Sequence, residues 1–341
     1  MTTTIPRTYR RVVLASRPQG APVRPDNFRL EDVPVPAAGP GQVLVRNHFL
    51  SLDPYMRGRM EEAKSYASPQ PIGETMVGGT VGVVEASQHP GFAPGEAVVG
   101  MLGWAEYGLS DGRMLNKVDT RHVPLSAYLG PVGMPGVTAW YGLRQICAPK
   151  AGETVLVSAA SGAVGSVVGQ LARMLGCRAV GIAGGPEKCA YVRDELGFDA
   201  CVDHREHGDL KSMGRALREA APDGIDCLFE NVGGVGFDAA LARMNAFGRI
   251  ALCGLIAGYE GGDIAVQNVR ALLVSRLKLQ GFIVSEHMEH WPAALAELGQ
   301  AVATGRIKYR ESIAEGLAAA PEAFIGMLHG RNFGKQLVKL V

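Results

Sequence analysis

The second half of the chain alternates short apolar runs with longer segments in which apolar residues recur at every third or fourth position. Runs rich in Val, Ile and Leu are typical of strands in a parallel sheet that helices cover on both faces. We expect six such strands, at residues 154–158, 179–183, 200–203, 225–231, 249–254 and 278–284. Six alternations of strand and helix predict an α/β domain with a Rossmann-type, doubly wound parallel sheet.

The first part of the chain has a different pattern, because 16 of the 20 prolines precede residue 150. Proline interrupts helices and central strands, so short strands joined by turns are expected there. Apolar patches at 42–46, 79–84 and 96–99 alternate with GPG and PG turn sequences. This pattern predicts a partly closed β-barrel.

The tail of the chain no longer repeats the strand-helix unit. After about residue 305 we expect a short strand, a helix that starts at Pro321 and a last strand over 335–341. We therefore predict a barrel domain at 1–130, a nucleotide-binding domain at 131–304, and a C-terminal segment at 305–341 that returns to the first domain.

Charge and composition exclude several classes of function. There are 34 basic and 33 acidic residues, a net charge of +1, so we expect no nucleic acid or anionic membrane partner. The chain has no apolar run of signal-peptide or membrane-helix length, which favours a cytoplasmic protein. The six cysteines are scattered singly without a CxxC motif, as in proteins with reduced, buried thiols.

The stretch SAASGAVGSVVGQLARMLG at 158–176 joins the first predicted strand to a helix expected to begin near Ala163. Gly162 and Gly165 occupy the second and third positions of a dinucleotide-binding fingerprint, and Ala160 takes the first. Alanine fits there if its φ stays negative, and the helix start offers N–H groups to a pyrophosphate. The alternative is a turn of small residues without a ligand, but the six-strand context favours a dinucleotide.

The end of the second predicted strand reads AGGPEK at 183–188. An NAD site usually has an acidic residue about 20 positions after the glycines, where it accepts hydrogen bonds from the ribose. Here Gly184 and Gly185 leave room for a 2′-phosphate, and Lys188 would neutralise it. Glu187 falls beyond the strand and is expected to point to solvent. The sequence therefore favours NADP(H) over NAD.

No metal site can be assembled from the barrel region, which contains no cysteine. His48, His89 and His122 lie singly, without the spacing of metal ligands. Glu74 lies where zinc dehydrogenases have a Gly-His-Glu triplet, but the histidine is absent. Without a Lewis acid, hydride delivery to a conjugated C=C bond is favoured, since a phenol can stabilise the enolate oxygen. Tyrosines are therefore the catalytic candidates, and we expect no metal.

Eight motifs in the same order along the chain carry a family resemblance. They are SLDPYMRGRM (51–60), AASGAVGSVVGQLA (159–172), GIAGGPEKC (181–189), LGFDACVDH (196–204), ENVGG (230–234), CGLIAGY (253–259), LQGFIV (279–284) and GRNFGKQLV (330–338). The chain resembles the medium-chain dehydrogenase/reductase superfamily, in the zinc-free branch with prostaglandin reductases, double-bond reductases and bacterial curcumin reductases. The resemblance implies that the barrel is the GroES-like substrate and catalytic domain of that superfamily.

The resemblance also implies roles for individual residues. The pyrophosphate would lie against Gly162, Ala163, Val164 and Gly165, and Lys188 would bind the 2′-phosphate. His204 aligns where many relatives have a tyrosine beside that phosphate, after a one-residue insertion. The other positions that match cofactor contacts of the family are Asn231, Cys253, Gly254, Tyr259, Phe282, Ile283, Val284 and Asn332.

For catalysis, the resemblance implies that Tyr259 donates a hydrogen bond to the enolate and that Tyr55 orients the substrate. The expected reaction is NADPH-dependent reduction of the C=C bond of an α,β-unsaturated ketone or aldehyde, by a homodimer. Two alternatives stay open from the sequence. One is an NADPH:quinone reductase of the same superfamily, and the other is a non-enzymatic NADPH-binding protein.

Overall fold

The computed structural model describes residues 5–262 and 264–341. These residues form two compact units, each with its own sheet and core. Unit 1 comprises residues 5–129, 311–332 and 336–341, and unit 2 comprises the described residues of 130–310 together with 333–335.

Unit 2 contains a six-stranded sheet in which every recorded pairing is parallel. Its strands are β8 (Thr154–Val157), β9 (Arg178–Ala183), β10 (Ala200–Asp203), β11 (Ile225–Glu230), β12 (Met244–Leu252) and β13 (Lys278–Gly281). The order β10-β9-β8-β11-β12-β13 is the 3-2-1-4-5-6 order of a doubly wound dinucleotide fold. The predicted fold class is confirmed. The largest differences from the expected bounds are at the start of β12, which is Met244 rather than residue 249, and at the end of β13, which is Gly281 rather than residue 284.

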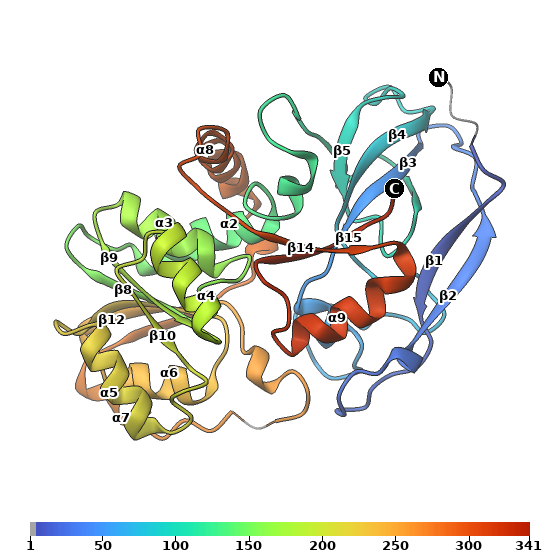
Figure 1. The fold of residues 1–341 in the computed structure, drawn as a ribbon. Helices are drawn as coiled ribbons and strands as arrows, with labels where there is room; N and C mark the ends of the chain where they lie inside the picture. The colour runs from blue at the N-terminus through green and yellow to red at the C-terminus, as the bar shows by residue number, and fades with distance from the viewer. Residues whose placement is uncertain (1–4, 263) are drawn as a thin grey trace. The chain divides into compact units, whose positions relative to one another are not determined.

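Helices cover both faces of this sheet (Figure 1). The helices of unit 2 are α2 (Met134–Tyr141), α3 (Gly165–Met174), α4 (Pro186–Ala190), α5 (Leu210–Ala220), α6 (Gly234–Leu241), α7 (Arg270–Val274) and α8 (Trp291–Ala303). α2 and α3 lie on one face, and α5 and α6 on the other. Asp209 caps α5 by accepting hydrogen bonds from the N–H groups of Lys211 and Ser212.

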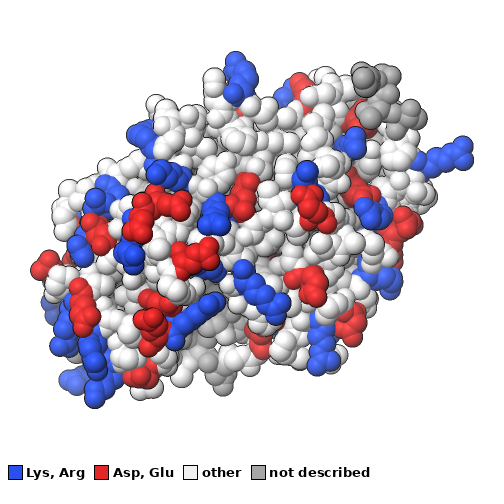
Figure 2. All heavy atoms as spheres, viewed as in Figure 1, with Lys and Arg blue, Asp and Glu red and all other residues white. Residues whose placement is uncertain are grey.

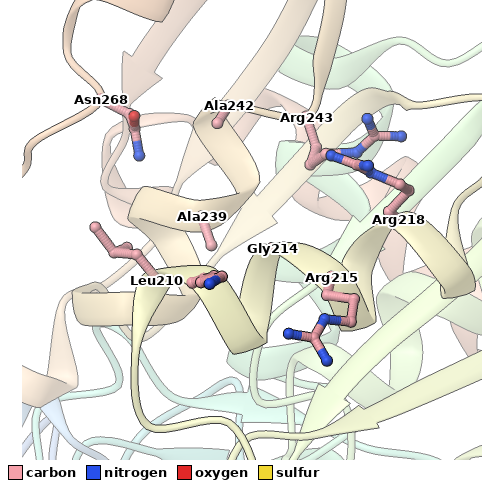
Figure 3. A pocket seen from close by; sticks show the side chains of 9 residues that line it. Leu210, Gly214, Arg215, Arg218, Ala239, Ala242, Arg243 and Asn268 are labelled. Atoms are coloured by element: carbon pink, nitrogen blue, oxygen red, sulfur yellow. The ribbon is translucent and has the colours of Figure 1, made fainter.

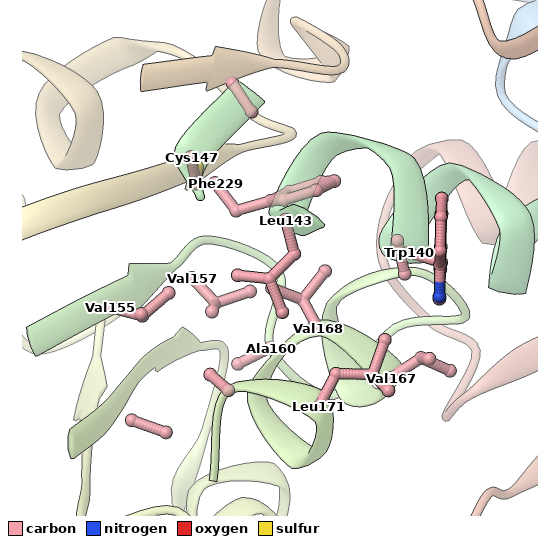
Figure 4. Close-up of a cluster of buried hydrophobic side chains, with 14 of the residues drawn as sticks. Trp140, Leu143, Cys147, Val155, Val157, Ala160, Val167, Val168, Leu171 and Phe229 are labelled. Atoms are coloured by element: carbon pink, nitrogen blue, oxygen red, sulfur yellow. The ribbon is translucent and has the colours of Figure 1, made fainter. Parts of the chain in front are cut away.

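Alternate residues of each strand supply two separate cores, as the period of a β-strand requires. Val155 and Val157 join the core against α2 and α3, whereas Leu156 joins the core against α5 and α6. In the same way, Phe229 joins the first of these cores and Leu228 joins the second. Figure 4 shows the first core, where Val167, Val168 and Leu171 of α3 meet the strand residues. All of these side chains are buried, and they fix the end of β8 against the start of α3.

Unit 1 is built mainly from antiparallel strands. β1 (Thr8–Leu14) and β2 (Phe28–Pro34) form a pair of their own. The larger sheet comprises β3 (Val43–Ser51), β4 (Thr80–Ser87), β5 (Ala97–Gly100), β6 (Tyr107–Ser110), β7 (Asn116–Lys117), β14 (Glu311–Glu315) and β15 (Lys335–Lys339). β15 pairs with β3, so the end of the chain is part of the sheet that its beginning forms.

Two α-helices occur among the described residues of unit 1, α1 (Tyr55–Arg59) and α9 (Ala320–Leu328). Phe324 of α9 packs edge to face on Trp104, with ring centroids 5.6 Å apart, and Phe28 stacks on the same tryptophan at 5.3 Å. The large hydrophobic area of such rings dominates the packing energy of a core. The C-terminal helix is therefore anchored in unit 1.

Charged side chains of both signs lie interspersed over the face shown in Figure 2, in keeping with the net charge of +1. No helix among the described residues has the length and apolar character needed to cross a membrane.

Candidate cofactor and active site

The turn between β8 and α3 has the tight geometry of a phosphate-binding turn. Ala159 adopts a positive φ of 48°, whereas Ala160 stays outside the left-handed region, as the prediction for alanine at the first fingerprint position required. The N–H group of Ala160 donates to the carbonyl oxygen of Ile182, 3.0 Å away. A Cβ on Gly165 would lie 2.4 Å from the carbonyl oxygen of Ala159, so only glycine fits there. α3 begins at Gly165, slightly later than the expected start near Ala163.

A buried hydrogen-bond network joins the ends of β8 and β11. The Ser158 hydroxyl donates to Glu230 Oε1, at 2.9 Å, and accepts from the N–H group of Asn231, at 2.7 Å. The Asn231 side-chain amide also donates to the carbonyl oxygen of Ser158, at 2.8 Å. The network therefore fixes Asn231, a predicted cofactor contact, at the carboxyl edge of the sheet.

Glu230 is fully buried in this network. Its Oε1 also accepts from the N–H groups of Val232 and Gly233, at 2.6 and 2.7 Å. Burial raises the pKa of the Glu230 carboxyl, and these hydrogen bonds act in the opposite direction. The motif ENVGG pointed to this strand end, but the role of Ser158 and Glu230 was not predicted.

Two basic side chains, those of His204 and Arg205, lie against the two glycines that follow β9. A Cβ on Gly184 would lie 2.7 Å from His204 Nε2 and 3.2 Å from Arg205 Nε, and a Cβ on Gly185 would lie 3.2 Å from an Arg205 guanidinium nitrogen. Partial burial, followed by the charge of Arg205, lowers the pKa of Lys188. His204 and Lys188 also interact electrostatically. The predicted residues Lys188 and His204 thus share one positively charged site, and Arg205 is a third member that was not predicted.

Asp203 holds the backbone of this basic site in place. Its Oδ1 accepts from the N–H groups of Gly185, at 2.8 Å, and Arg205, at 3.0 Å. Gly185 has a φ of +94°, a conformation that favours glycine. Glu187 is exposed in the first turn of α4, as expected.

Phe333 provides an aromatic wall next to the basic site. The guanidinium of Arg310 lies 4.0 Å from its ring centroid and Lys188 Nζ lies 6.0 Å from it. The Tyr191 ring packs on Phe333 edge to face at 4.9 Å. Segments far apart in the sequence therefore border the same basic site within unit 2.

Gly254, Asn231 and Tyr259 lie together beyond the ends of β11 and β12. A Cβ on Gly254 would lie 3.3 Å from the carbonyl oxygen of Asn231 and 3.6 Å from the Tyr259 hydroxyl. Tyr259 follows a short helical turn, Ile256–Gly258. The predicted catalytic phenol is thus adjacent to two predicted cofactor contacts.

Other predicted cofactor contacts make hydrogen bonds and packing contacts within unit 2. The N–H group of Cys253 donates to the carbonyl oxygen of Glu230, at 2.8 Å, and burial raises the pKa of the Cys253 thiol to about 12. Phe282 packs on Tyr141 at 5.5 Å, and Val284 is buried in the core. Ile283 lies between them with an extended backbone.

Tyr55 and Asn332 belong to unit 1. Tyr55 is the first residue of α1, and its buried hydroxyl has no hydrogen-bond partner among the described residues. Burial, followed by the charge of Asp53, raises the pKa of Tyr55, which keeps the phenol protonated as a donor. Asp53 accepts a hydrogen bond from Ser51. Asn332 lies in the loop between α9 and β15.

Arg57 lies two residues after Tyr55 in α1. It is 2 % exposed and donates to Glu61, at 2.7 Å, and to the carbonyl oxygen of Ala21, at 3.0 Å. These contacts connect α1 to the loop around residue 21.

No group of three or more His, Cys, Asp or Glu side chains that could hold a metal occurs within residues 5–262 and 264–341. A cavity of about 410 Å³ lies between α5 and α6 (Figure 3) and is lined by Leu210, Lys211, Gly214, Arg215, Arg218, Ala239, Ala242, Arg243 and Asn268. None of the predicted site residues is among them, so this cavity is separate from the candidate site.

Known proteins are similar in sequence to this chain over almost its whole length. Residues 10–118 match a family described as the N-terminal domain of oxidoreductase, and residues 163–300 match one described as zinc-binding dehydrogenase. The NADPH-dependent curcumin reductase of Escherichia coli (strain K12) is 48 % identical over 338 residues, which cover 97 % of this chain and 96 % of the relative. The chain belongs to the medium-chain dehydrogenase/reductase superfamily. This confirms the family that the eight motifs predicted.

Two further members of the superfamily are similar over most of their length. The NADP(+)-dependent 2-alkenal reductase of Nicotiana tabacum is 44 % identical and covers 88 % of both chains. The crystal structure of CurA from Vibrio vulnificus in complex with NADPH has a TM-score of 0.91 and 46 % identity, covering 97 % of this chain and 99 % of its own. The similarity extends across the segments of both units.

Proposed function

We propose that this protein uses NADPH to reduce the C=C bond of α,β-unsaturated ketones and aldehydes. The observation that carries the proposal is the similarity of nearly the whole chain to an NADPH-dependent curcumin reductase and to a 2-alkenal reductase. Curcumin and 2-alkenals share a C=C bond conjugated to a carbonyl group. The proposed substrate class is therefore a small enone or enal.

The residues of unit 2 fit NADPH. Gly162, Ala163, Val164 and Gly165 would hold the pyrophosphate, supported by the tight turn at Ala159. Lys188, His204 and Arg205 would bind the 2′-phosphate. His204 and Arg205 lie against the two glycines, Lys188 is close enough to both to affect or feel their charge, and basic groups together suit a dianion. Bound NADPH supplies the hydride for the reaction. The remaining proposed cofactor contacts are Asn231, Cys253, Gly254, Tyr259, Phe282, Ile283 and Val284 of unit 2, and Asn332 of unit 1.

Two phenols would act on the substrate carbonyl. Tyr259 would donate a hydrogen bond to its oxygen, where negative charge develops as the β-carbon becomes saturated. Its position beside Gly254 and Asn231 supports this role. Tyr55 would orient the same carbonyl. Its buried hydroxyl, which has no partner in the part of the chain that the structure describes, and the raised pKa that keeps this hydroxyl protonated support the role. Solvent or Tyr259 would then protonate the α-carbon.

The proposal is tested by measuring NADPH consumption with an aliphatic enone, a long-chain enal, curcumin and a quinone in parallel. We expect kcat/KM to be highest for an enone or enal, with the saturated carbonyl compound as product. Faster reduction of the quinone would favour the quinone reductase alternative. No NADPH oxidation with any of the four would favour a non-enzymatic NADPH-binding protein.

We also propose that the protein is a cytoplasmic homodimer. Scattered cysteines without paired spacing support a reducing compartment. The edge strand β13 and the neighbouring α7 carry exposed apolar side chains, including Leu273 at 78 % and Val274 at 55 % exposure, which support contact with a second copy. Light scattering during gel filtration measures the mass of the protein in solution and so tests the dimer. The mass of a monomer would contradict it.

A further inference from the structure

Two cysteines beside the basic site are close enough to react with each other. Cys189 lies in α4 and Cys201 in β10, and the Cys201 thiol donates a hydrogen bond to Cys189 Sγ across 3.2 Å. Neither residue was assigned a role from the sequence beyond that of a buried thiol. The two sulfur atoms lie about 1 Å beyond the length of a disulfide bond, which is about 2.05 Å.

The environment makes the two thiols unequal. The hydrogen bond from Cys201 lowers the pKa of Cys189, and the same hydrogen bond, with burial, raises the pKa of Cys201. A thiolate is the nucleophilic form of cysteine, so Cys189 is the more nucleophilic of the two sulfurs. Cys189 is 4 % exposed, whereas Cys201 is only partly buried, so the pair lies near the surface of unit 2.

We propose that Cys189 and Cys201 form an oxidative modification site, at which a hydroperoxide converts the two thiols to an intramolecular disulfide. The Cys189 thiolate attacks the hydroperoxide, whose O–O bond breaks to give a sulfenic acid and an alcohol, or water from hydrogen peroxide. Cys201 then attacks the sulfenic sulfur, and water leaves. Two thiols are oxidised, one hydroperoxide is reduced by two electrons, and a dithiol restores the pair by exchange.

The position of the pair connects this modification to the proposed NADPH site. Lys188 immediately precedes Cys189, and Asp203, two residues after Cys201, holds the backbone of both Gly185 and Arg205. Closing the sulfur atoms to bonding distance shifts α4 relative to β10, and the basic side chains are attached to these two elements. The disulfide therefore weakens NADPH binding and leaves NADH binding little changed. This goes beyond the proposed reaction and does not depend on which substrate is reduced.

Mass spectrometry of the full-length protein tests the modification itself. The protein is treated with a small molar excess of hydrogen peroxide, blocked with an alkylating reagent, and digested without reduction. We expect peptides containing Cys189 and Cys201 to be linked, with the loss of two hydrogen atoms, and to separate after treatment with dithiothreitol. Cys189→Ser and Cys201→Ser should each abolish this link. Cys177→Ala, which removes a buried thiol that donates to a backbone carbonyl 3.3 Å away, should retain it.

Two results would overturn the modification site: both thiols remain alkylatable after peroxide treatment, or they are oxidised without becoming linked. The wild-type peptide map gives this answer even if a serine variant folds poorly. Titration of NADPH and NADH by fluorescence, before and after oxidation, tests the link to the cofactor site. After oxidation, we expect the Kd of NADPH to rise several-fold only in chains that contain both cysteines. An unchanged Kd in the disulfide-bonded protein would contradict the proposed effect on NADPH binding.

Discussion

Gly181 of β9 lies directly against Ala160 in the turn after β8. A Cβ on Gly181 would lie 2.7 Å from the Cβ of Ala160 and 3.0 Å from Cγ1 of Val192. The glycine of β9 therefore provides the space that the alanine in the first fingerprint position occupies. The positive φ is found one residue earlier, at Ala159. An alanine at the first fingerprint position therefore fits because residue 181 on the neighbouring strand is a glycine.

We expect Gly181→Ala to destabilise the protein by about 1–3 kcal/mol, because an added methyl group in a packed interior forces its neighbours to move. Ala160→Gly in the same chain should recover part of this loss. Gly214→Ala is the matched control, since a Cβ at this position in α5 meets nothing within 4 Å. It should be neutral or stabilising by up to about 1 kcal/mol. Urea unfolding measures the free energy of unfolding of the wild-type protein and of these three variants. Equal losses of stability in Gly181→Ala and Gly214→Ala would contradict the packing argument.

Coenzyme preference should depend on Lys188 and Arg205. Lys188→Ala should raise the KM for NADPH at least tenfold, since a charge-assisted contact with phosphate contributes about 1.5–3 kcal/mol. Arg205→Ala should act in the same direction, and neither change should affect NADH much. Lys211→Ala is the control, because Lys211 is exposed on α5 and lines the separate cavity. Steady-state kinetics with both coenzymes check this. Equal increases in KM for NADPH and NADH would show that the two residues do not bind the 2′-phosphate.

The pH dependence of NADPH binding should report on His204. Partial burial lowers its pKa below the ordinary value of 6.5, Asp203 opposes the shift, and Arg205 adds to it. A bound 2′-phosphate raises the pKa again, since a nearby negative charge favours the imidazolium. Binding therefore takes up a proton, and NADPH affinity should increase as the pH falls from about 8 to about 6.5, where the phosphate is still largely a dianion.

Isothermal titration of NADPH at several pH values and in several buffers measures this proton uptake. His204→Gln should reduce both the uptake and the gain in affinity, and NADH should show neither effect in the wild-type protein. Proton release on NADPH binding would contradict the placement of His204 beside the phosphate.

The sequence predicted the parallel strands of unit 2 well because their burial on both faces requires continuous apolar runs. β8 and β11 both begin where predicted, at Thr154 and Ile225. β12 was predicted too short, since its first half contains the exposed Phe247, which has a positive φ of 63° and interrupts the apolar pattern. Residues 282–284 continue the apolar run after β13, but they lie beyond the strand, where Val284 is buried in the core and Phe282 is partly buried against it.

The basic site shows the limit of reading residues along the chain. Lys188 could be predicted because it follows the glycines within one motif. Arg205 could not, because its guanidinium reaches Gly185 only through the parallel pairing of β10 with β9. The sequence DHRE at 203–206 contains Arg205 next to His204. Only the pairing of β10 with β9 shows that this arginine lies near the glycines after β9. The contact between Cys189 and Cys201 has the same origin.

Both proposed catalytic tyrosines should affect turnover more than coenzyme binding. Tyr259→Phe should lower kcat about 100-fold, the usual loss when a donor to a developing oxyanion is removed. Tyr55→Phe should cost less, about tenfold, because an orienting hydroxyl contributes less than the principal donor. The Kd of NADPH should change much less than kcat in either variant. Tyr128→Phe is the control, since its hydroxyl donates to the carbonyl oxygen of Asp119, at 2.6 Å. Full activity in both Tyr259→Phe and Tyr55→Phe would remove the phenols from the mechanism.

The most direct test of the account is to follow the transferred hydride. NADPH deuterated at nicotinamide C4, on the face from which the enzyme transfers, is incubated with the wild-type protein and an aliphatic enone, and the product is analysed by NMR. The account predicts a saturated ketone with deuterium on the former β-carbon and a solvent proton on the α-carbon. An allylic alcohol with deuterium on the carbinol carbon would contradict it, because the enzyme would then reduce the carbonyl group and not the C=C bond.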